Sequence, residues 1–245
     1  MNRTTARFRL QGRDIDFDLV RKKSVRRNVL VRFEENGRMS VSAPLRASTR
    51  EVQRILTRMH DQIVELRQQV REQNRGVKPL RYRHGSDHFY LGRSYELDVV
   101  RVTGIGHRVH LQSHGIEVRV GARGEEPVRD ALLAWYRRRA LDFCGERMDR
   151  IAANARFLRG CTFDMRLRRM KRSWGTCSAR GVITLNPMLM KAAPRYIDYV
   201  IAHELCHLVE LNHSPAFYRL MDRIMPDWPA LRRGLNERAH LYLRW

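Results

Sequence analysis

The sequence contains few of the features that mark membrane-spanning, secreted or disulfide-stabilised proteins. It has no run of about 18 apolar residues, the least that a transmembrane helix needs. Residues 1–19 alternate charged and apolar side chains and lack the uninterrupted apolar segment of a signal peptide. The cysteines Cys144, Cys161, Cys177 and Cys206 have no paired spacing, so we expect free thiols. Together these absences predict a cytoplasmic protein.

Acidic residues are also scarce relative to basic ones. The chain carries 26 Asp and Glu against 48 Lys and Arg, a formal charge of +22. Such an excess favours anionic partners, nucleic acid among them. Residues 166–172 are especially rich in arginine, and Arg169 and Arg172 there are candidates for holding a phosphate. A basic face that is simply solvated explains the same pattern, and the sequence leaves both readings open.

The strongest chemical signal is the motif His203-Glu204-Leu205-Cys206-His207. Positions four apart lie on one face of a helix, so His203 and His207 can bind one cation. Two neutral imidazoles suit zinc, and a catalytic zinc site usually has three protein ligands and one open position for water. Glu204 would then act as the general base that deprotonates this water.

The position of Glu204 on its helix supports this interpretation over two incidental histidines. A helix through residues 194–210 has an apolar stripe made of Ile197, Val200, Ile201, Leu205 and Leu208. Glu204 falls inside that stripe, where a carboxylate is costly unless a charge or hydrogen bonds compensate it. A water held by the adjacent metal would supply this compensation.

His213 is the candidate third ligand. It lies six residues after His207, so the helix must end before His213 can turn back toward the metal. Ser214-Pro215 predicts the start of a new helix, and Asn212 can adopt the left-handed conformation that ends the previous one. Glu237, on a later helix, is the competing candidate.

The sequence around this motif resembles that of a known family. The stretch His203 to His213, preceded by Ser173-Trp174-Gly175-Thr176-Cys177-Ser178, is similar to the YgjP-like metallohydrolases, relatives of the SprT-like zincins. The resemblance implies one Zn²⁺ ion on His203, His207 and His213 with Glu204 as base. It also implies that the strand containing Trp174, Gly175 and Thr176 lies beside the active-site helix.

The N-terminal half is predicted to be rich in strands. Residues 8–10 and 15–19 alternate around Gln11-Gly12, and residues 29–33 and 39–41 flank Asn36-Gly37, a strong hairpin turn. An amphipathic helix is expected from Ser48 to about Asn74, followed by further strands up to Val120.

A long helix from residue 125 then opens the C-terminal half. We therefore predict an α+β protein with two regions that share one core or form two. Residues 1–124 form a β-rich region with one long helix, and residues 125–245 form a zincin-like metallohydrolase unit.

The predicted function is zinc-dependent hydrolysis, most simply of peptides. A substrate strand would add to the edge near Trp174, Gly175 and Thr176, and the Tyr199 phenol could donate to an oxyanion or pack at the core rim. Two alternatives remain. One is hydrolysis of a nucleotide phosphoanhydride at the arginine-rich segment, and the other is nucleic-acid binding by a protein with structural zinc.

Overall fold

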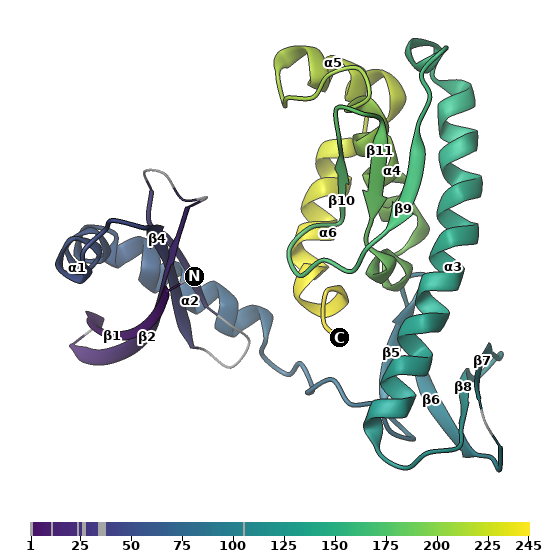
Figure 1. Cartoon of the computed structure of the whole chain (residues 1–245), viewed down its shortest axis with the longest axis horizontal. Helices are drawn as coiled ribbons and strands as arrows, with labels where there is room; N and C mark the ends of the chain where they lie inside the picture. The colour runs from purple at the N-terminus through teal and green to yellow at the C-terminus, as the bar shows by residue number, and fades with distance from the viewer. Residues whose placement is uncertain (1, 11, 24, 26–27, 34–37, 105) are drawn as a thin grey trace. The chain divides into compact units, whose positions relative to one another are not determined.

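A computed structural model describes residues 2–10, 12–23, 25, 28–33, 38–104 and 106–245 (Figure 1). Over these residues the chain forms six α-helices and three β-sheets, so the broad prediction of a mixed α+β protein is confirmed. The chain divides into two compact units, Met1–Lys78 and Pro79–Trp245. Each unit has its own hydrophobic core.

The first unit is built on a four-stranded sheet with the order β1-β2-β4-β3. Its strands are β1 (Asn2–Leu10), β2 (Arg13–Lys22), β3 (Leu30–Phe33) and β4 (Met39–Pro44). The β1–β2 and β3–β4 pairs are antiparallel, as the hairpin patterns predict, and β2 pairs parallel to β4. Gln11 and the predicted Asn36-Gly37 turn lie outside the described residues.

Two helices cover this sheet where the sequence predicts one. They are α1 (Thr49–Arg58) and α2 (His60–Gln73), and the chain departs from helical geometry at Met59 between them. The predicted start is confirmed, because the Ser48 hydroxyl accepts from the backbone of Glu51 while the Glu51 carboxylate accepts from the backbone of Ser48. The two helices pack against the sheet through three buried side chains, Val52, Leu56 and Ile63.

The second unit begins with another four-stranded sheet, of order β5-β6-β8-β7. Its strands are β5 (Asp87–Tyr90), β6 (Arg93–Arg101), β7 (His107–Leu111) and β8 (Gly115–Val120). The 30-residue helix α3 (Glu125–Asn154) packs its first turns on β7 and β8 (Figure 1).

This packing corrects the predicted boundary near Gly124. Val118 and Val120 of β8 are buried in the same cluster as Leu132 and Trp135 of α3. The second group of strands therefore belongs with the C-terminal helices, and the division of contacts falls between Lys78 and Pro79. The sequence composition changes at Gly124, but residues on both sides of it pack in the same hydrophobic core.

The remaining elements position the candidate site. A three-stranded sheet of order β10-β11-β9 comprises β9 (Asp164–Leu167), β10 (Gly175–Cys177) and β11 (Val182–Leu185). Two short 3₁₀ turns, Arg156–Leu158 and Pro187–Lys191, precede β9 and follow β11. The helices α4 (Pro194–Cys206), α5 (Pro215–Ile224) and α6 (Trp228–Tyr242) complete the chain.

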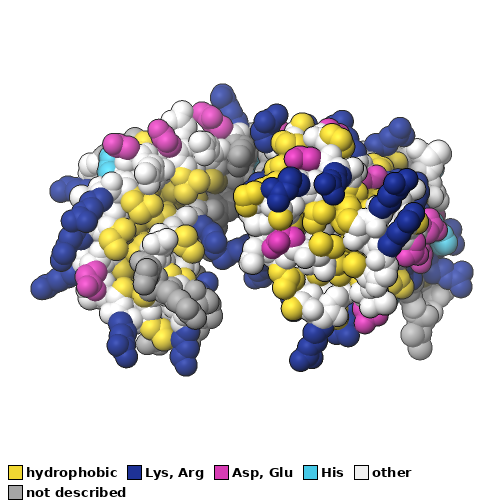
Figure 2. Space-filling model, turned by 90° about the horizontal axis from the view of Figure 1, so that it is seen from above, with side chains coloured by type: hydrophobic (Ala, Val, Ile, Leu, Met, Phe, Trp, Pro, Cys, Tyr) yellow, Lys and Arg dark blue, Asp and Glu magenta, His cyan; other side chains and the backbone are white. Residues whose placement is uncertain are grey.

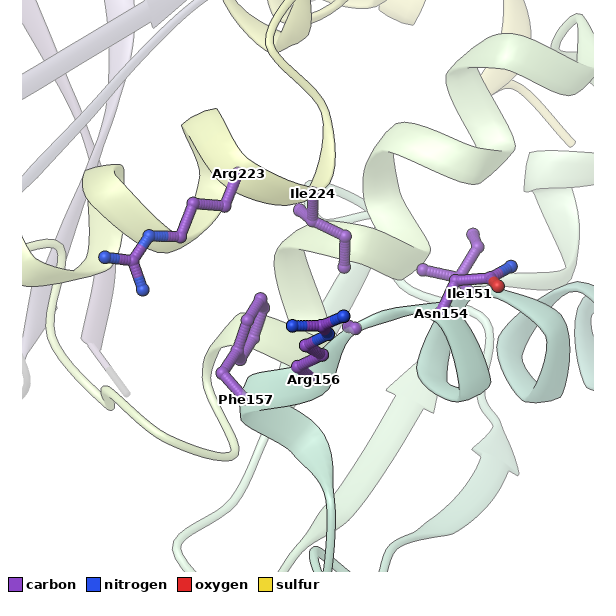
Figure 3. Close-up of a pocket in the computed structure, with 7 residues that line it drawn as sticks. Ile151, Asn154, Arg156, Phe157, Arg223 and Ile224 are labelled. Carbon is purple, nitrogen blue, oxygen red and sulfur yellow. The ribbon is translucent and has the colours of Figure 1, made fainter.

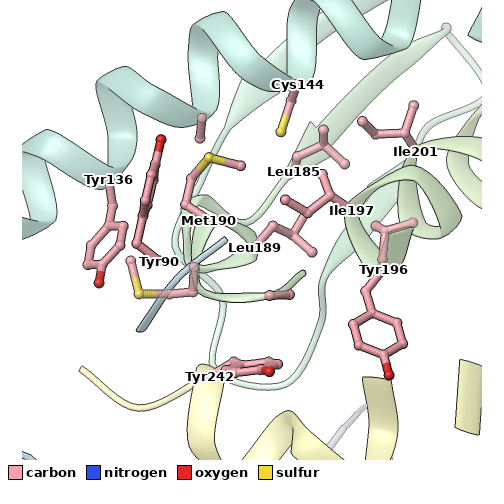
Figure 4. Packing of buried hydrophobic residues seen from close by; sticks show 14 of the residues in the cluster. Tyr90, Tyr136, Cys144, Leu185, Leu189, Met190, Tyr196, Ile197, Ile201 and Tyr242 are labelled. Atoms are coloured by element: carbon pink, nitrogen blue, oxygen red, sulfur yellow. The ribbon is translucent and has the colours of Figure 1, made fainter. Parts of the chain in front are cut away.

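One continuous core joins both sheets and all four helices of the second unit. Figure 4 shows Tyr90, Tyr136, Leu185, Met190 and Ile197 converging from β5, α3, β11, the second 3₁₀ turn and α4. The Arg147 guanidinium of α3 also binds the carboxylate of Asp198 on α4 at 2.5 to 2.6 Å. The helix that carries the histidine motif is therefore fixed to α3 by this ion pair and by the shared core.

The surface reflects the excess of arginine. In Figure 2, Lys and Arg side chains are scattered over the face in view of each unit and do not gather in a single patch. Across the described part of the chain, every helix is too short or too polar to span a lipid bilayer.

Candidate metal centre

The helix α4 presents the motif because its apolar stripe is buried as predicted. Ile197, Ile201 and Leu205 have no exposed surface, and the helix packs against α3, α5, α6 and β10. Pro194 occupies the first turn, where its missing N–H costs nothing. Cys206 is the last helical residue and His207 is the C-cap. His203 and His207 therefore both lie at the C-terminal end of α4.

The chain then turns and starts α5, as Ser214-Pro215 predicts. The Ser214 hydroxyl accepts from the backbone N–H groups of Ala216 and Phe217 at 3.1 and 3.3 Å. The left-handed backbone conformation predicted for Asn212 is wrong. Leu91 is the only non-glycine residue with positive φ in the described chain. The backbone oxygen of Cys206 instead accepts from the N–H groups of Val209 and Glu210 at 3.1 and 3.0 Å.

This corner brings three imidazoles together. The Nε2 atom of His203 lies 3.2 Å from that of His207 and 3.0 Å from that of His213. One ligand atom from each histidine lies within 4.8 Å of the other two. The three side chains that the sequence proposes as ligands therefore face a common point.

The spacing of these nitrogen atoms fits a small tetrahedral cation. A zinc ion bound at about 2.0 to 2.1 Å separates two tetrahedral ligand nitrogens by roughly 3.3 Å, close to the two separations from His203. Burial, reinforced by the neighbouring His207 and His213, lowers the pKa of His203 to about 3. Burial also lowers the pKa of His213. Neutral imidazoles keep their lone pairs available, so the donor set suits a borderline-soft divalent metal.

Neighbouring groups fix the orientation of the rings. Nδ1 of His207 donates to the backbone oxygen of Glu210 at 2.9 Å, which leaves Nε2 free to bind a metal. The fully buried Phe217 of α5 stacks on His207 with a centroid distance of 4.5 Å and meets His203 and His213 edge-on at 4.9 and 4.8 Å. The sequence analysis did not identify Phe217, although its place three residues after the Ser214 cap marks it as facing inward.

Glu204 lies in the core-facing stripe beside these rings. Only 4% of its surface is exposed, and burial raises the pKa of its carboxyl group to about 8. Its Oε2 atom has no hydrogen-bond partner among the described residues. A buried carboxylate without a partner is expensive, so this atom indicates that something other than protein completes the site.

The predicted substrate-binding residues occupy different places. Gly175 opens β10 directly against the Glu204 side chain, Trp174 precedes it half-buried, and Thr176 is exposed on the same strand. The Tyr199 ring lies 6.0 Å from the His203 ring, one turn earlier on α4. Thus Gly175 contacts the proposed base, and the Tyr199 ring neighbours that of His203.

The two arginines proposed for phosphate binding show no such relation to the cluster. Arg169 places its guanidinium 3.6 Å from the centre of the Trp245 ring, at the C-terminus of the chain. Arg172 is exposed in the loop before β10. Glu237 is also separate from the cluster, since it is 70% exposed and lies 3.7 Å from the Arg238 guanidinium.

Arg232 is a charged neighbour that the sequence analysis missed. It lies on α6, which packs against α4, one turn after Trp228, whose ring stacks on that of Tyr218 at 5.2 Å. Burial has the largest effect on the pKa values of Tyr199, His203 and His213, and the positive charge of Arg232 acts to lower all three. Nothing in the local sequence distinguishes this arginine from the many others.

A separate cavity of about 520 Å³ lies between the end of α3 and the end of α5 (Figure 3). Its lining consists of Ile151, Asn154, Ala155, Arg156, Phe157, Arg223 and Ile224. None of the predicted site residues lines this cavity. The histidine cluster is at the opposite, N-terminal end of α5.

No curated protein matches the chain. Among solved structures, the crystal structure of the metallopeptidase zymogen of Pyrococcus abyssi abylysin matches at 25% sequence identity, covering 40% of this chain and 93% of that one with a TM-score of 0.32. A family model described as the YgjP-like metallopeptidase domain matches residues 27–238, which include every proposed ligand. The protein therefore belongs to the YgjP-like family of metallopeptidase-domain proteins.

Proposed function

We propose that this protein is a zinc-dependent metallopeptidase with one metal ion. The observation that carries the proposal is the convergence of three imidazole nitrogens beside a buried carboxylate whose Oε2 atom has no hydrogen-bond partner among the described residues. His203, His207 and His213 are the proposed ligands, and Glu204 is the proposed general base. Membership of a metallopeptidase-domain family supports the reaction class.

Among the described residues the cluster offers three ligand atoms, and a catalytic zinc site with three protein ligands keeps a fourth position for water. Zinc bound there would lower the pKa of a coordinated water to about 7 and polarise the scissile carbonyl. His207 is kept in the ligating tautomer by the Glu210 carbonyl, and Phe217 restricts the rotation of all three rings. The residues therefore hold the site in a fixed geometry before the metal arrives.

Glu204 moves the proton. Its carboxylate removes a proton from the attacking water and returns it to the leaving amine nitrogen, so that the amine departs neutral. A base must accept and release protons at the working pH, and burial moves the pKa of Glu204 toward neutrality. The same burial excludes bulk water from the proton transfer.

The substrate strand is proposed to lie along β10. This strand pairs only with β11 in its sheet, and its other edge is unpaired among the described strands. A polypeptide adding to Gly175 and Thr176 would place its own backbone next to Glu204. Tyr199 and Arg232 lie near enough to the cluster to act on negative charge that develops on the substrate carbonyl.

No structural observation favours the two alternatives. Phosphate binding beside the metal by Arg169 is opposed by its stacking on Trp245. A structural zinc site is normally closed by four ligands, and the described cluster has three. The buried Glu204 also has no role in a purely structural site.

The Glu204→Gln variant tests the proposal. The purified zinc-loaded protein and the variant are assayed on unfolded polypeptides and, in parallel, on nucleoside triphosphates. We expect peptide hydrolysis to fall by about 10²-fold or more while bound zinc is unchanged, because the amide cannot accept the proton. Glu237→Gln, which alters an exposed carboxylate, is the matched control. Peptide cleavage by Glu204→Gln at the wild-type rate would refute the role of Glu204.

A further inference from the structure

Gly175 leaves a space that the Glu204 side chain fills. A Cβ atom placed on Gly175 would lie 2.6 Å from Oε1, 2.7 Å from Cγ and 2.8 Å from Cδ of Glu204. Non-bonded carbon atoms normally approach to about 3.5 to 4.0 Å, so even a methyl group cannot share this space with the carboxylate. The base therefore lies directly against the backbone of β10.

The backbone conformation does not require glycine at this position. Nine described glycines have positive φ, and Gly175 is not one of them. An alanine at residue 175 would adopt the same φ and ψ without strain. What is specific to glycine here is the absence of a side chain.

The strand cannot move aside easily, because hydrogen bonds hold the segment up to Gly175 and pairing of Thr176 and Cys177 with β11 holds the residues after it. The Trp174 oxygen accepts from the backbone N–H of Asn186 at 2.8 Å, and the Gly175 oxygen accepts from the Ser173 hydroxyl at 2.7 Å. The fully buried side-chain amide of Asn186 donates to the oxygens of Met170 and Ser173 at 2.7 and 3.0 Å. These bonds fix β10 relative to β11.

The Glu204 carboxylate, in contrast, is less firmly held than β10. Its Oε2 atom has no hydrogen-bond partner among the described residues. When a side chain at residue 175 and the Glu204 carboxylate compete for the same space, we expect the carboxylate to move and the fold to be retained.

We propose that Gly175 is a positioning residue, whose missing side chain sets where the Glu204 carboxylate lies. This proposal rests on the proposed role of Glu204 as base. It gives the Trp174-Gly175-Thr176 segment a second function besides binding substrate. The segment forms the wall against which the base is seated.

The test is Gly175→Ala in the full-length, zinc-loaded protein. We expect kcat to fall by about 10- to 100-fold, since displacement of a reacting group by about 1 Å can cost two orders of magnitude. KM and bound zinc are expected to stay at their wild-type values. Gly145→Ala on α3, where a new Cβ would meet nothing closer than Met165 Cε at 3.9 Å, is the matched control.

A truncated base provides the matching double-variant experiment. In Glu204→Ala the Cγ, Cδ and carboxylate oxygens that a Cβ on residue 175 would meet are all absent. Glu204→Ala alone should lower kcat by about 10²-fold or more, and adding Gly175→Ala to it should cost less than threefold more. If Gly175→Ala lowers kcat by the same factor in both backgrounds, the effect does not pass through Glu204 and the proposal is wrong.

A crystal structure of metal-free Gly175→Ala gives a readout that does not depend on activity. Displacement of the Glu204 carboxylate with β10 unmoved would support the proposal, and an unmoved carboxylate would overturn it. If instead Glu204→Gln remains fully active, the proposed function fails, while this structure still decides whether Gly175 positions the side chain. The two failures are therefore distinguishable.

Discussion

Replacing His213 by alanine should weaken zinc binding while the protein still folds. His213 is exposed in the turn between α4 and α5, so its removal leaves the core almost intact. Four-ligand zinc sites in small peptides bind with about 10 to 16 kcal/mol, which is roughly 3 kcal/mol per ligand. Loss of one ligand should therefore weaken zinc binding by about 10²-fold.

The loss is measurable as a change in thermal stability. At a free zinc concentration about 100 times Kd, the metal stabilises the wild-type fold by about 2.7 kcal/mol. A 10²-fold weaker site gains only about 0.4 kcal/mol at the same concentration. With about 2 to 4 °C per kcal/mol for a chain of this size, the zinc-dependent rise in Tm should fall from roughly 5–10 °C to about 1 °C.

Glu237→Ala is the matched comparison, because Glu237 is the competing ligand candidate and is exposed on α6. Zinc content after dialysis is measured for both variants alongside the Tm. Full occupancy in His213→Ala together with loss of zinc in Glu237→Ala would refute the three-histidine assignment.

The other predictions concern stability and charge. Burial lowers the pKa of His88 to about 4, so the unfolded chain binds an extra proton below about pH 6.5. Stability should fall by about 3 kcal/mol between pH 6.5 and pH 4, and urea unfolding of His88→Gln, which does not take up this proton, should show a weaker pH dependence. Asn186→Ala should lower the free energy of unfolding by about 2 kcal/mol, because two partly buried backbone oxygens lose their donor. An unchanged denaturation midpoint would show that these bonds contribute little. Joint replacement of Arg169 and Arg172 by glutamine should leave kcat/KM for a neutral peptide within about twofold, since Arg169 stacks on Trp245. A selective rise in KM for nucleotides would instead revive the phosphate-site interpretation.

The parts of the molecule that the sequence predicts well are those set by local patterns. The apolar stripe of α4 and the Ser214-Pro215 start of α5 are encoded within a few residues of the chain. They were enough to indicate that His213 returns toward His203. The capping box at Ser48 is of the same kind.

The missed features depend on contacts between distant segments. Arg232 stands out only because α6 packs on α4, and Asn186 only because its amide reaches back to Met170 and Ser173. The boundary near Gly124 was misplaced for the same reason. A change from strand to helix composition does not show that β8 and α3 share one core.

The close packing of Gly175 on Glu204 also has a consequence for the order of folding. The three imidazoles come from one short stretch, residues 203–213, so they can assemble once α4 and the start of α5 have formed, at little cost in chain entropy. Gly175 reaches Glu204 only when β10 packs on α4, a contact between residues 29 positions apart in the sequence (204 − 175). We therefore expect a nascent or partly unfolded chain to capture metal before its base is seated. Such a chain would be a metal-binding but inactive species, so hydrolysis begins only when the fold is complete.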